Sequence, residues 1–153
     1  MDEAGQSLAV HFQNLGLPPD AAGWLLDIWQ LIQAWDDVAD ADGIERDRLD
    51  RAIWASLVTM PANPFYLANA GALQAGLALL VLKWQASDDA ERAGKADARS
   101  YMWRAGYYDL VLLVVLLTKG HATAMKDAMT VMHLYGETLH EYLKEFPSCP
   151  HQS

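Results

Sequence analysis

The sequence predicts an all-α protein, folded as a single bundle of five or six mostly antiparallel helices. Apolar side chains recur with helical spacing, no segment shows the alternation of a half-buried strand, and Gly, Pro and Asn separate the periodic segments. The connections near residues 60–63, 93–95 and 119–121 are short, which favours antiparallel neighbours. We expect one helical domain over residues 1–146 and a short tail over residues 147–153.

The first two helices are separated by the turn residues 16–19. The first helix is expected over residues 6–14. The second should begin at an N-cap Asp20 and end at Asp40, with Gly43 as the left-handed residue beyond it. Six apolar side chains of this second helix follow the i, i+3, i+4, i+7 rule: Trp24, Leu25, Ile28, Leu31, Ile32 and Trp35.

The third helix is expected over residues 46–59. Asn63 and Pro64 then have the residue types of an N-cap and a first helical position, so the fourth helix should begin there and continue to residue 92. A fifth helix is expected over residues 96–118 and a sixth over residues 122–146. We expect five large apolar side chains in or beside the core: Ile28, Trp35, Trp54, Leu79 and Leu113.

Composition limits the class of protein. The chain has 153 residues, 52% of them hydrophobic, which is enough for a substantial core. Its formal net charge of −9 argues against nucleic-acid binding, because that binding depends on Lys and Arg contacts to phosphates.

Location is predicted from three features. The acidic start Met1-Asp2-Glu3 lacks the basic region of a signal peptide. The longest uninterrupted apolar run, residues 110–117, is far shorter than the ~20 residues of a membrane span. The single Cys149 cannot form an internal disulfide, which fits a reducing compartment. We therefore expect a cytoplasmic protein without a membrane helix.

Asp36, Asp37 and Asp40 form a DDxxD string at the end of the second predicted helix. Asp36 and Asp40 lie one turn apart on one face, and carboxylate oxygens suit Mg²⁺ ions that bridge to substrate phosphates. The helix dipole disfavours anions at this end, so the placement opposes local stability. The string is either a Mg²⁺ site or a solvated acidic turn, and four acidic residues just beyond it favour the turn: Asp42, Glu45, Asp47 and Asp50.

A second acidic cluster, with Asp88 and Glu91, lies near the end of the fourth predicted helix. If successive helices alternate in direction, helices two and four end at the same pole, and the fifth helix, with Arg99 and Arg104, starts there. We therefore predict a metal site at this pole, with these ligands: Asp36, Asp37, Asp40, Asp88 and Glu91. The structural alternative for the second cluster is exposed ion pairs with Arg92 and Lys95, which stabilise little.

Arg104 is the basic residue of a mostly apolar segment, residues 101–109, so we do not expect it to be fully exposed. One interpretation is a structural ion pair with an Asp that locks the bundle. The other is capture of a phosphate or carboxylate by the guanidinium fork. In that case Arg104 and Arg99 would neutralise the phosphates in catalysis.

Three resemblances attach to these residues. The string at residues 36–40 resembles the first aspartate-rich motif of isoprenoid diphosphate synthases and terpene cyclases. That resemblance implies Mg²⁺ bridging a diphosphate, with Asp36 and Asp40 as ligands. In size, and in its acidic pairs on successive helices, the chain is similar to small all-α nucleotide pyrophosphatases. In residues 24–40, 63–66 and 103–109 it resembles small helical proteins of tailed phages and prophages, which implies a host-cytoplasmic or virion location.

Two classes of function follow, and the sequence does not decide whether the protein is an enzyme. The first is a Mg²⁺-dependent protein that binds or acts on a diphosphate-containing small molecule in an acidic pocket. The alternative is a non-enzymatic phage accessory or structural protein that binds another protein through an apolar-aromatic face. We also expect a homodimer, because residues 110–117 and 75–82 are more apolar than one small bundle can cover. The alternative is a monomer in which the fifth helix is central and the fourth helix has small residues at its contacts.

Overall fold

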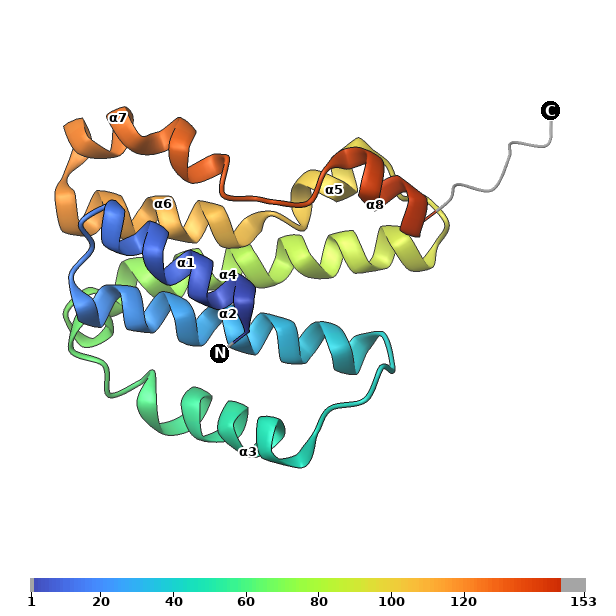
Figure 1. Cartoon of the computed structure of the whole chain (residues 1–153), viewed down its shortest axis with the longest axis horizontal. Coiled ribbons are helices and arrows are strands. Elements are labelled where there is room, and N and C mark those ends of the chain that lie inside the picture. Colours follow the sequence, from blue (N-terminus) through green and yellow to red (C-terminus); the bar gives the residue numbers. More distant parts are fainter. Residues whose placement is uncertain (1, 147–153) are drawn as a thin grey trace.

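The computed structural model describes residues 2–146, which contain helices and no strand, so the predicted all-α class is confirmed (Figure 1). The helices are α1 (Glu3–Asn14), α2 (Pro19–Ala39), α3 (Arg46–Trp54), α4 (Pro64–Arg92), α5 (Ala98–Trp103), α6 (Gly106–Lys119), α7 (His121–Met132) and α8 (Leu139–Glu145), and a π-helical turn, η1 (Ala55–Thr59), continues α3. These segments are more numerous than the predicted five or six. The predicted tail, with Cys149, lies outside the described residues.

The start of α4 is set by local chemistry that the sequence displays. Asn63 Oδ1 accepts hydrogen bonds from the backbone N–H groups of Phe65, at 2.9 Å, and Tyr66, at 3.2 Å. Pro64 occupies the first turn, where a missing N–H costs nothing. The predicted N-cap and both predicted bounds of this helix are therefore confirmed.

The predicted ends of α2 are wrong in detail. Pro18 is the N-cap residue and Pro19 begins the helix, so Asp20 lies inside the first turn. At the other end, the first left-handed residue after the helix is Ala41, with a φ of 58°. Gly43 is left-handed as predicted, with a φ of 81°, but it lies two residues further on and is not the residue that follows the C-cap.

Two predicted helices are divided. The fifth breaks at Arg104, between α5 and α6, and the sixth breaks between α7 and α8. Gly106 begins α6 in close contact with α4, since a Cβ at this position would lie 3.5 Å from Leu80 Cα. α8 begins with its own capping box, in which Thr138 Oγ1 accepts from the Glu141 N–H and Glu141 Oε2 accepts from the Thr138 N–H.

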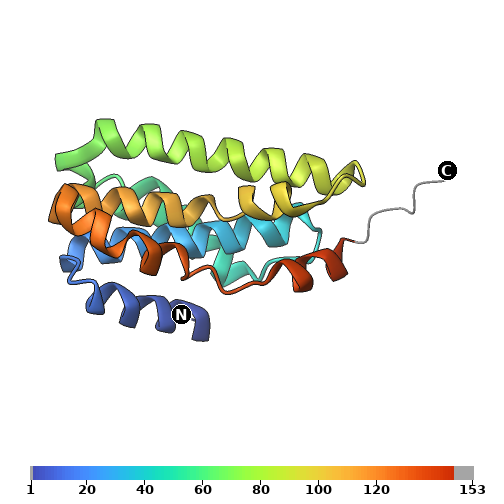
Figure 2. The same cartoon turned by 90° about the horizontal axis from the view of Figure 1, so that it is seen from above.

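α6 is the central helix and contacts α2, α4 and α7 (Figure 2). Its buried side chains are Tyr107, Tyr108, Leu110, Val111, Val114 and Val115. Gly76 of α4 allows close approach, because a Cβ there would lie 2.8 Å from Leu113 Cδ2. The apolar run over residues 110–117 is thus largely covered within one chain, although Leu116 stays exposed.

The predicted core is right for Ile28, which is buried, and for Leu113, which packs beside the core. Trp35, Trp54 and Leu79 were expected there as well, and all three are exposed. α3 contacts α2 with half-buried side chains and buries none of them, which leaves Trp54 in contact with solvent. α4 lies at one edge of the bundle, so Leu79, on its outer face, is exposed.

Candidate functional site

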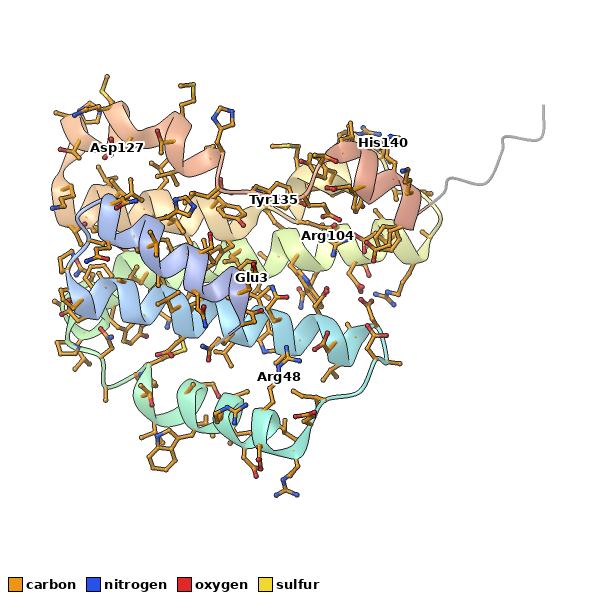
Figure 3. The ribbon with its side chains drawn as sticks, in the orientation of Figure 1. Glu3, Arg48, Arg104, Asp127, Tyr135 and His140 are labelled. Atoms are coloured by element: carbon orange, nitrogen blue, oxygen red, sulfur yellow. The ribbon has the colours of Figure 1, made fainter. Side chains whose placement is uncertain are left out.

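Arg104 lies at the centre of the pole where the sequence predicted a site. It is the C-cap residue of α5, and its side chain is 19% exposed. Figure 3 labels Arg104 and, near it, Tyr135. The Nη1 atom of Arg104 lies 3.5 Å from Glu91 Oε1 of α4, and its Nη2 atom lies 3.9 Å from Asp36 Oδ2 of α2. The guanidinium carbon is 5.4 Å from the centre of the Tyr142 ring and 5.5 Å from that of Phe146. The alternating topology therefore brings Asp36, Glu91 and Arg104 together, as predicted.

The electrostatics of this cluster are those of a partly buried ion pair. Burial raises the pKa of Asp36 and of Glu91, and the neighbouring Arg104 opposes the rise. Burial on its own would lower the pKa of Arg104, but the facing carboxylates outweigh it and the pKa is raised. Glu91 also accepts hydrogen bonds from Ser87 Oγ, at 3.0 Å, and from the Tyr142 hydroxyl, at 3.1 Å. This geometry fits the interpretation of Arg104 as a structural ion pair that joins α2, α4 and α5.

The other predicted metal ligands face basic side chains or solvent. Asp37 pairs with Arg48 of α3, and exposed Asp40 ends α2. Asp88 lies 2.9 Å from the Arg92 guanidinium, which also pairs with Asp89. Across residues 2–146 no group of three or more His, Cys, Asp or Glu side chains is arranged to hold a metal ion. The Mg²⁺ site therefore stays a prediction without support from the side-chain arrangement.

Arg99, the second predicted catalytic residue, is exposed and lies 2.9 Å from Asp97. Asp97 is the N-cap of α5, so the pair belongs to the start of that helix. Arg99 does not line the cavity beside Arg104. The structure therefore separates the two arginines that the sequence grouped.

A cavity of about 410 Å³ lies between α1, α2 and the segment that joins α7 to α8. Its aromatic lining is Trp29, Trp84, Tyr107, Tyr108 and Tyr135, and its polar lining includes His11, Gln33, Asp36, Arg104 and Glu137. We call it the Arg104 cavity. Two of its residues, Trp29 and Arg104, each have a buried N–H group without a hydrogen-bond partner in the described structure. The volume is that of a small-molecule site.

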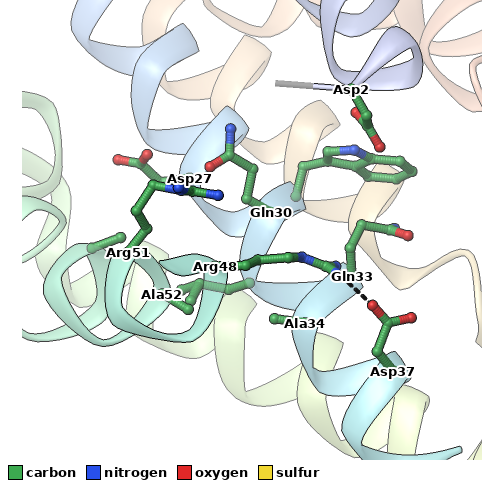
Figure 4. A pocket seen from close by; sticks show the side chains of 12 residues that line it. Asp2, Asp27, Gln30, Gln33, Ala34, Asp37, Arg48, Arg51 and Ala52 are labelled. Carbon is green, nitrogen blue, oxygen red and sulfur yellow. Dashed lines mark hydrogen bonds and ion pairs between the residues drawn. The ribbon is translucent and has the colours of Figure 1, made fainter. Parts of the chain in front are cut away.

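A second cavity, of about 470 Å³, lies between α2 and α3 (Figure 4). Arg48, Arg51 and Asp27 project into it, and the ion pair of Arg48 with Asp37 forms part of its wall. Burial raises the pKa of Asp27. The cavity is polar and its opposite charges are interspersed, so it has no strong preference for a ligand of either sign.

The most unusual surface of the molecule is apolar, and the motif search missed it. No Asp, Glu, Lys or Arg occurs from Ala52 to Leu82. Seven large apolar side chains of that segment are exposed: Ile53, Trp54, Leu57, Val58, Leu67, Leu79 and Leu82. Ile53, Trp54, Leu57 and Val58 share one face of α3 and η1, and we call them the α3 patch. The lack of charge was the signal that could have found this surface in the sequence.

No family model, no curated protein and no solved structure matches the chain. Among the helices of residues 2–146, α4 is the one that is long and apolar enough to cross a membrane, judged by length and composition only. The core helices of soluble proteins can pass the same test.

Proposed function

We propose that this protein is a non-enzymatic interaction protein that docks another protein on the α3 patch. The observation that carries the proposal is the exposure of Ile53, Trp54, Leu57 and Val58 side by side on one helical face. Large exposed apolar groups of this kind mark protein–protein contacts, in which Trp is enriched among the residues that contribute most binding energy.

The surroundings of the patch indicate the chemistry of the partner. Residues 52–60 carry no charge, whereas the preceding loop and α3 mix four carboxylates with three arginines: Asp42, Glu45, Asp47, Asp50, Arg46, Arg48 and Arg51. A complementary surface would have an apolar centre and a polar rim that carries charges of both signs. The π-helical turn η1 lies within the patch, and such turns are frequent at functional sites.

Photo-cross-linking tests this proposal. We expect a cross-linking amino acid at Leu57 to give a discrete protein adduct in cells, because this side chain is 72% exposed within the patch. The matched control is Val10, an exposed aliphatic residue of α1. With the captured protein purified, Leu57→Glu should weaken binding at least about tenfold, and Val10→Glu should leave it unchanged. Identical adducts from both positions, or equal affinities of the two variants, would refute the proposal.

A second candidate function is binding of a diphosphate-containing molecule with Mg²⁺ in the Arg104 cavity. The observation that favours it is the buried N–H group of Trp29, which has no hydrogen-bond partner in the described structure. Arg104 Nη1 is also without a hydrogen bond, since its contact with Glu91, at 3.5 Å, is an ion pair only. In this proposal Arg104 binds a phosphate oxygen, and Asp36 with Glu137, which line the same cavity, hold the ion.

Calorimetric titration with inorganic diphosphate, in the presence and absence of Mg²⁺, tests the second candidate. We expect a saturable heat that requires the metal and is lost in Asp36→Asn. Arg99→Gln should keep the full heat, because Arg99 is exposed and lies outside the cavity. Flat traces for the unmodified protein would remove this candidate.

A further inference from the structure

The outer face of α4 carries an apolar seam with the spacing of a coiled coil. The seam consists of five exposed side chains: Ala72, Ala75, Leu79, Leu82 and Ala86. They are alternately three and four residues apart, which is the a/d repeat along which a second helix packs. The side chains that face the protein's own core, Leu73, Leu80 and Ser87, lie about 120° away from the seam around the helix, on a separate face. In Figure 2, α4 forms one edge of the bundle, and no other described helix covers this outer face.

We propose that this seam pairs with the same seam of a second copy of the chain, antiparallel, about a two-fold axis at Leu77. Ala72 then faces the Leu82 position of the other copy, and Ala75 faces the Leu79 position. Each contact joins an a position to a d position, as an antiparallel coiled coil requires. Each small side chain also meets a large one, so the seam is complementary to itself. A parallel pair would place alanine on alanine and leave a gap.

A lipid bilayer is a poorer occupant than a second copy. A membrane-spanning α4 would have to withdraw Leu73 and Leu80 from the core that they form with α2 and α6. Surface attachment is also disfavoured, because the net charge of −9 is repelled by anionic lipids. The seam itself carries no charge, so two copies meet there without repulsion.

The length of the seam sets the strength of the dimer. Asn69 has non-helical φ and ψ angles of −127° and 20°, so the straight part of α4 begins after it. In the proposed register the two seams face each other from Ala72 to Leu82, over about 15 Å. Ala86 lies beyond this stretch, because its partner position, residue 68, comes before Asn69. Two such helices bury on the order of 1,000 Å² in total, at the lower end of specific interfaces. We expect a dissociation constant of about 1–10 µM.

Sedimentation equilibrium at about 1–100 µM, a range that brackets this constant, measures the dimer. We expect a mass that rises with concentration from 17.0 kDa to twice that value. Leu79→Glu places a charge in the seam of both copies and should raise the dissociation constant at least about 100-fold. Leu67→Glu is the matched control, because Leu67 lies on the same helix, off the seam, and is 63% exposed against 64% for Leu79. Equal helicity by circular dichroism shows that both variants fold.

Disulfide trapping tests the register in a Cys149→Ser background. Ala75→Cys combined with Leu79→Cys should oxidise to a covalent dimer, because these positions face each other across the axis. Ala72→Cys alone should not, since its two copies are about 15 Å apart along the helices.

A protein that stays at 17.0 kDa, a dimer that survives Leu79→Glu, or cross-linking by Ala72→Cys would overturn the inference. So would a monomer that floats with neutral phosphatidylcholine vesicles. The α3 patch is a different surface, and each of these results would leave its role untouched.

Discussion

Arg104→Met is expected to lower the free energy of unfolding by about 3–5 kcal/mol at pH 7. The substitution removes the cation that contacts Glu91 and Asp36, at 3.5 and 3.9 Å, and leaves two partly buried carboxylates without it. It also removes the guanidinium from the rings of Tyr142 and Phe146. Because Asp36 is about one-third exposed, solvent screens its share of the loss, and we expect a value near the lower bound.

The loss of stability caused by Arg104→Met should become smaller as the pH falls. The pKa values of Asp36 and Glu91 are raised in the folded protein, so the folded state takes up protons before the unfolded state as the pH falls. Removing Arg104 takes away the interaction that lowers both pKa values and raises them further. The destabilisation is therefore complete above the folded pKa values and shrinks as the pH falls from 7 towards 4. Urea denaturation of the unmodified protein and of Arg104→Met at several pH values measures the difference between their free energies of unfolding.

Two variants serve as controls. Arg99→Met removes an exposed arginine of the same helix, paired with Asp97, and should change stability by less than about 0.5 kcal/mol. The combination of Arg104→Met, Glu91→Gln and Asp36→Asn removes all three charges together and should recover most of the stability. A loss below about 1 kcal/mol for Arg104→Met, or one that is independent of pH, would contradict the buried ion pair.

The helix boundaries that the sequence predicted well are those set by local chemistry. The Asn63 cap with Pro64 behind it is complete within a few residues, so α4 follows from the sequence. The break at Arg104 does not follow in the same way, and Gly106, which begins α6 after it, packs beside the backbone of Leu80 in α4. That contact joins two helices, and periodicity within one segment carries no information about it.

In the predicted site, too, some contacts follow from helix direction or local spacing, and others depend on how the helices pack. Helix direction was enough to predict that Asp36, Glu91 and Arg104 meet. The capture of Asp88 and Asp89 by Arg92 was also readable, as i, i+4 and i, i+3 pairs. The pairing of Asp37 with Arg48 depends on how α3 folds back on α2, which the sequence pattern leaves open.

Exposure was the property that sequence periodicity predicted least well. α4 is apolar around most of its circumference, so its pattern cannot tell the core face at Leu80 from the outer face at Leu79. Trp54 was assigned to the core because of its residue type. It lies instead on a helix with a single packed stripe, and its exposure is what the docking proposal rests on.

Alanine substitutions of the buried Trp24 and the exposed Trp54 test how much each position contributes to stability. Trp24→Ala is expected to lower the free energy of unfolding by about 3–5 kcal/mol, as for other large-to-small substitutions in a packed core. Trp24 is 0% exposed and packs against Phe65 and Tyr66, with ring centres 6.4 and 6.0 Å away. Small domains have only about 5–15 kcal/mol in total, so the loss should be visible as a large shift of the urea midpoint.

Trp54→Ala removes the same side chain from a position that is 64% exposed. We expect stability to change by no more than about 0.5 kcal/mol, because little apolar surface is lost from the folded chain. The same substitution should weaken binding of the protein captured at Leu57 at least about tenfold. A loss of about 2 kcal/mol or more in the isolated chain would mean that Trp54 supports the fold, in the range of buried side chains. The α3 patch would then be part of the packing of α3, and the docking proposal would lose the side chain on which it most depends.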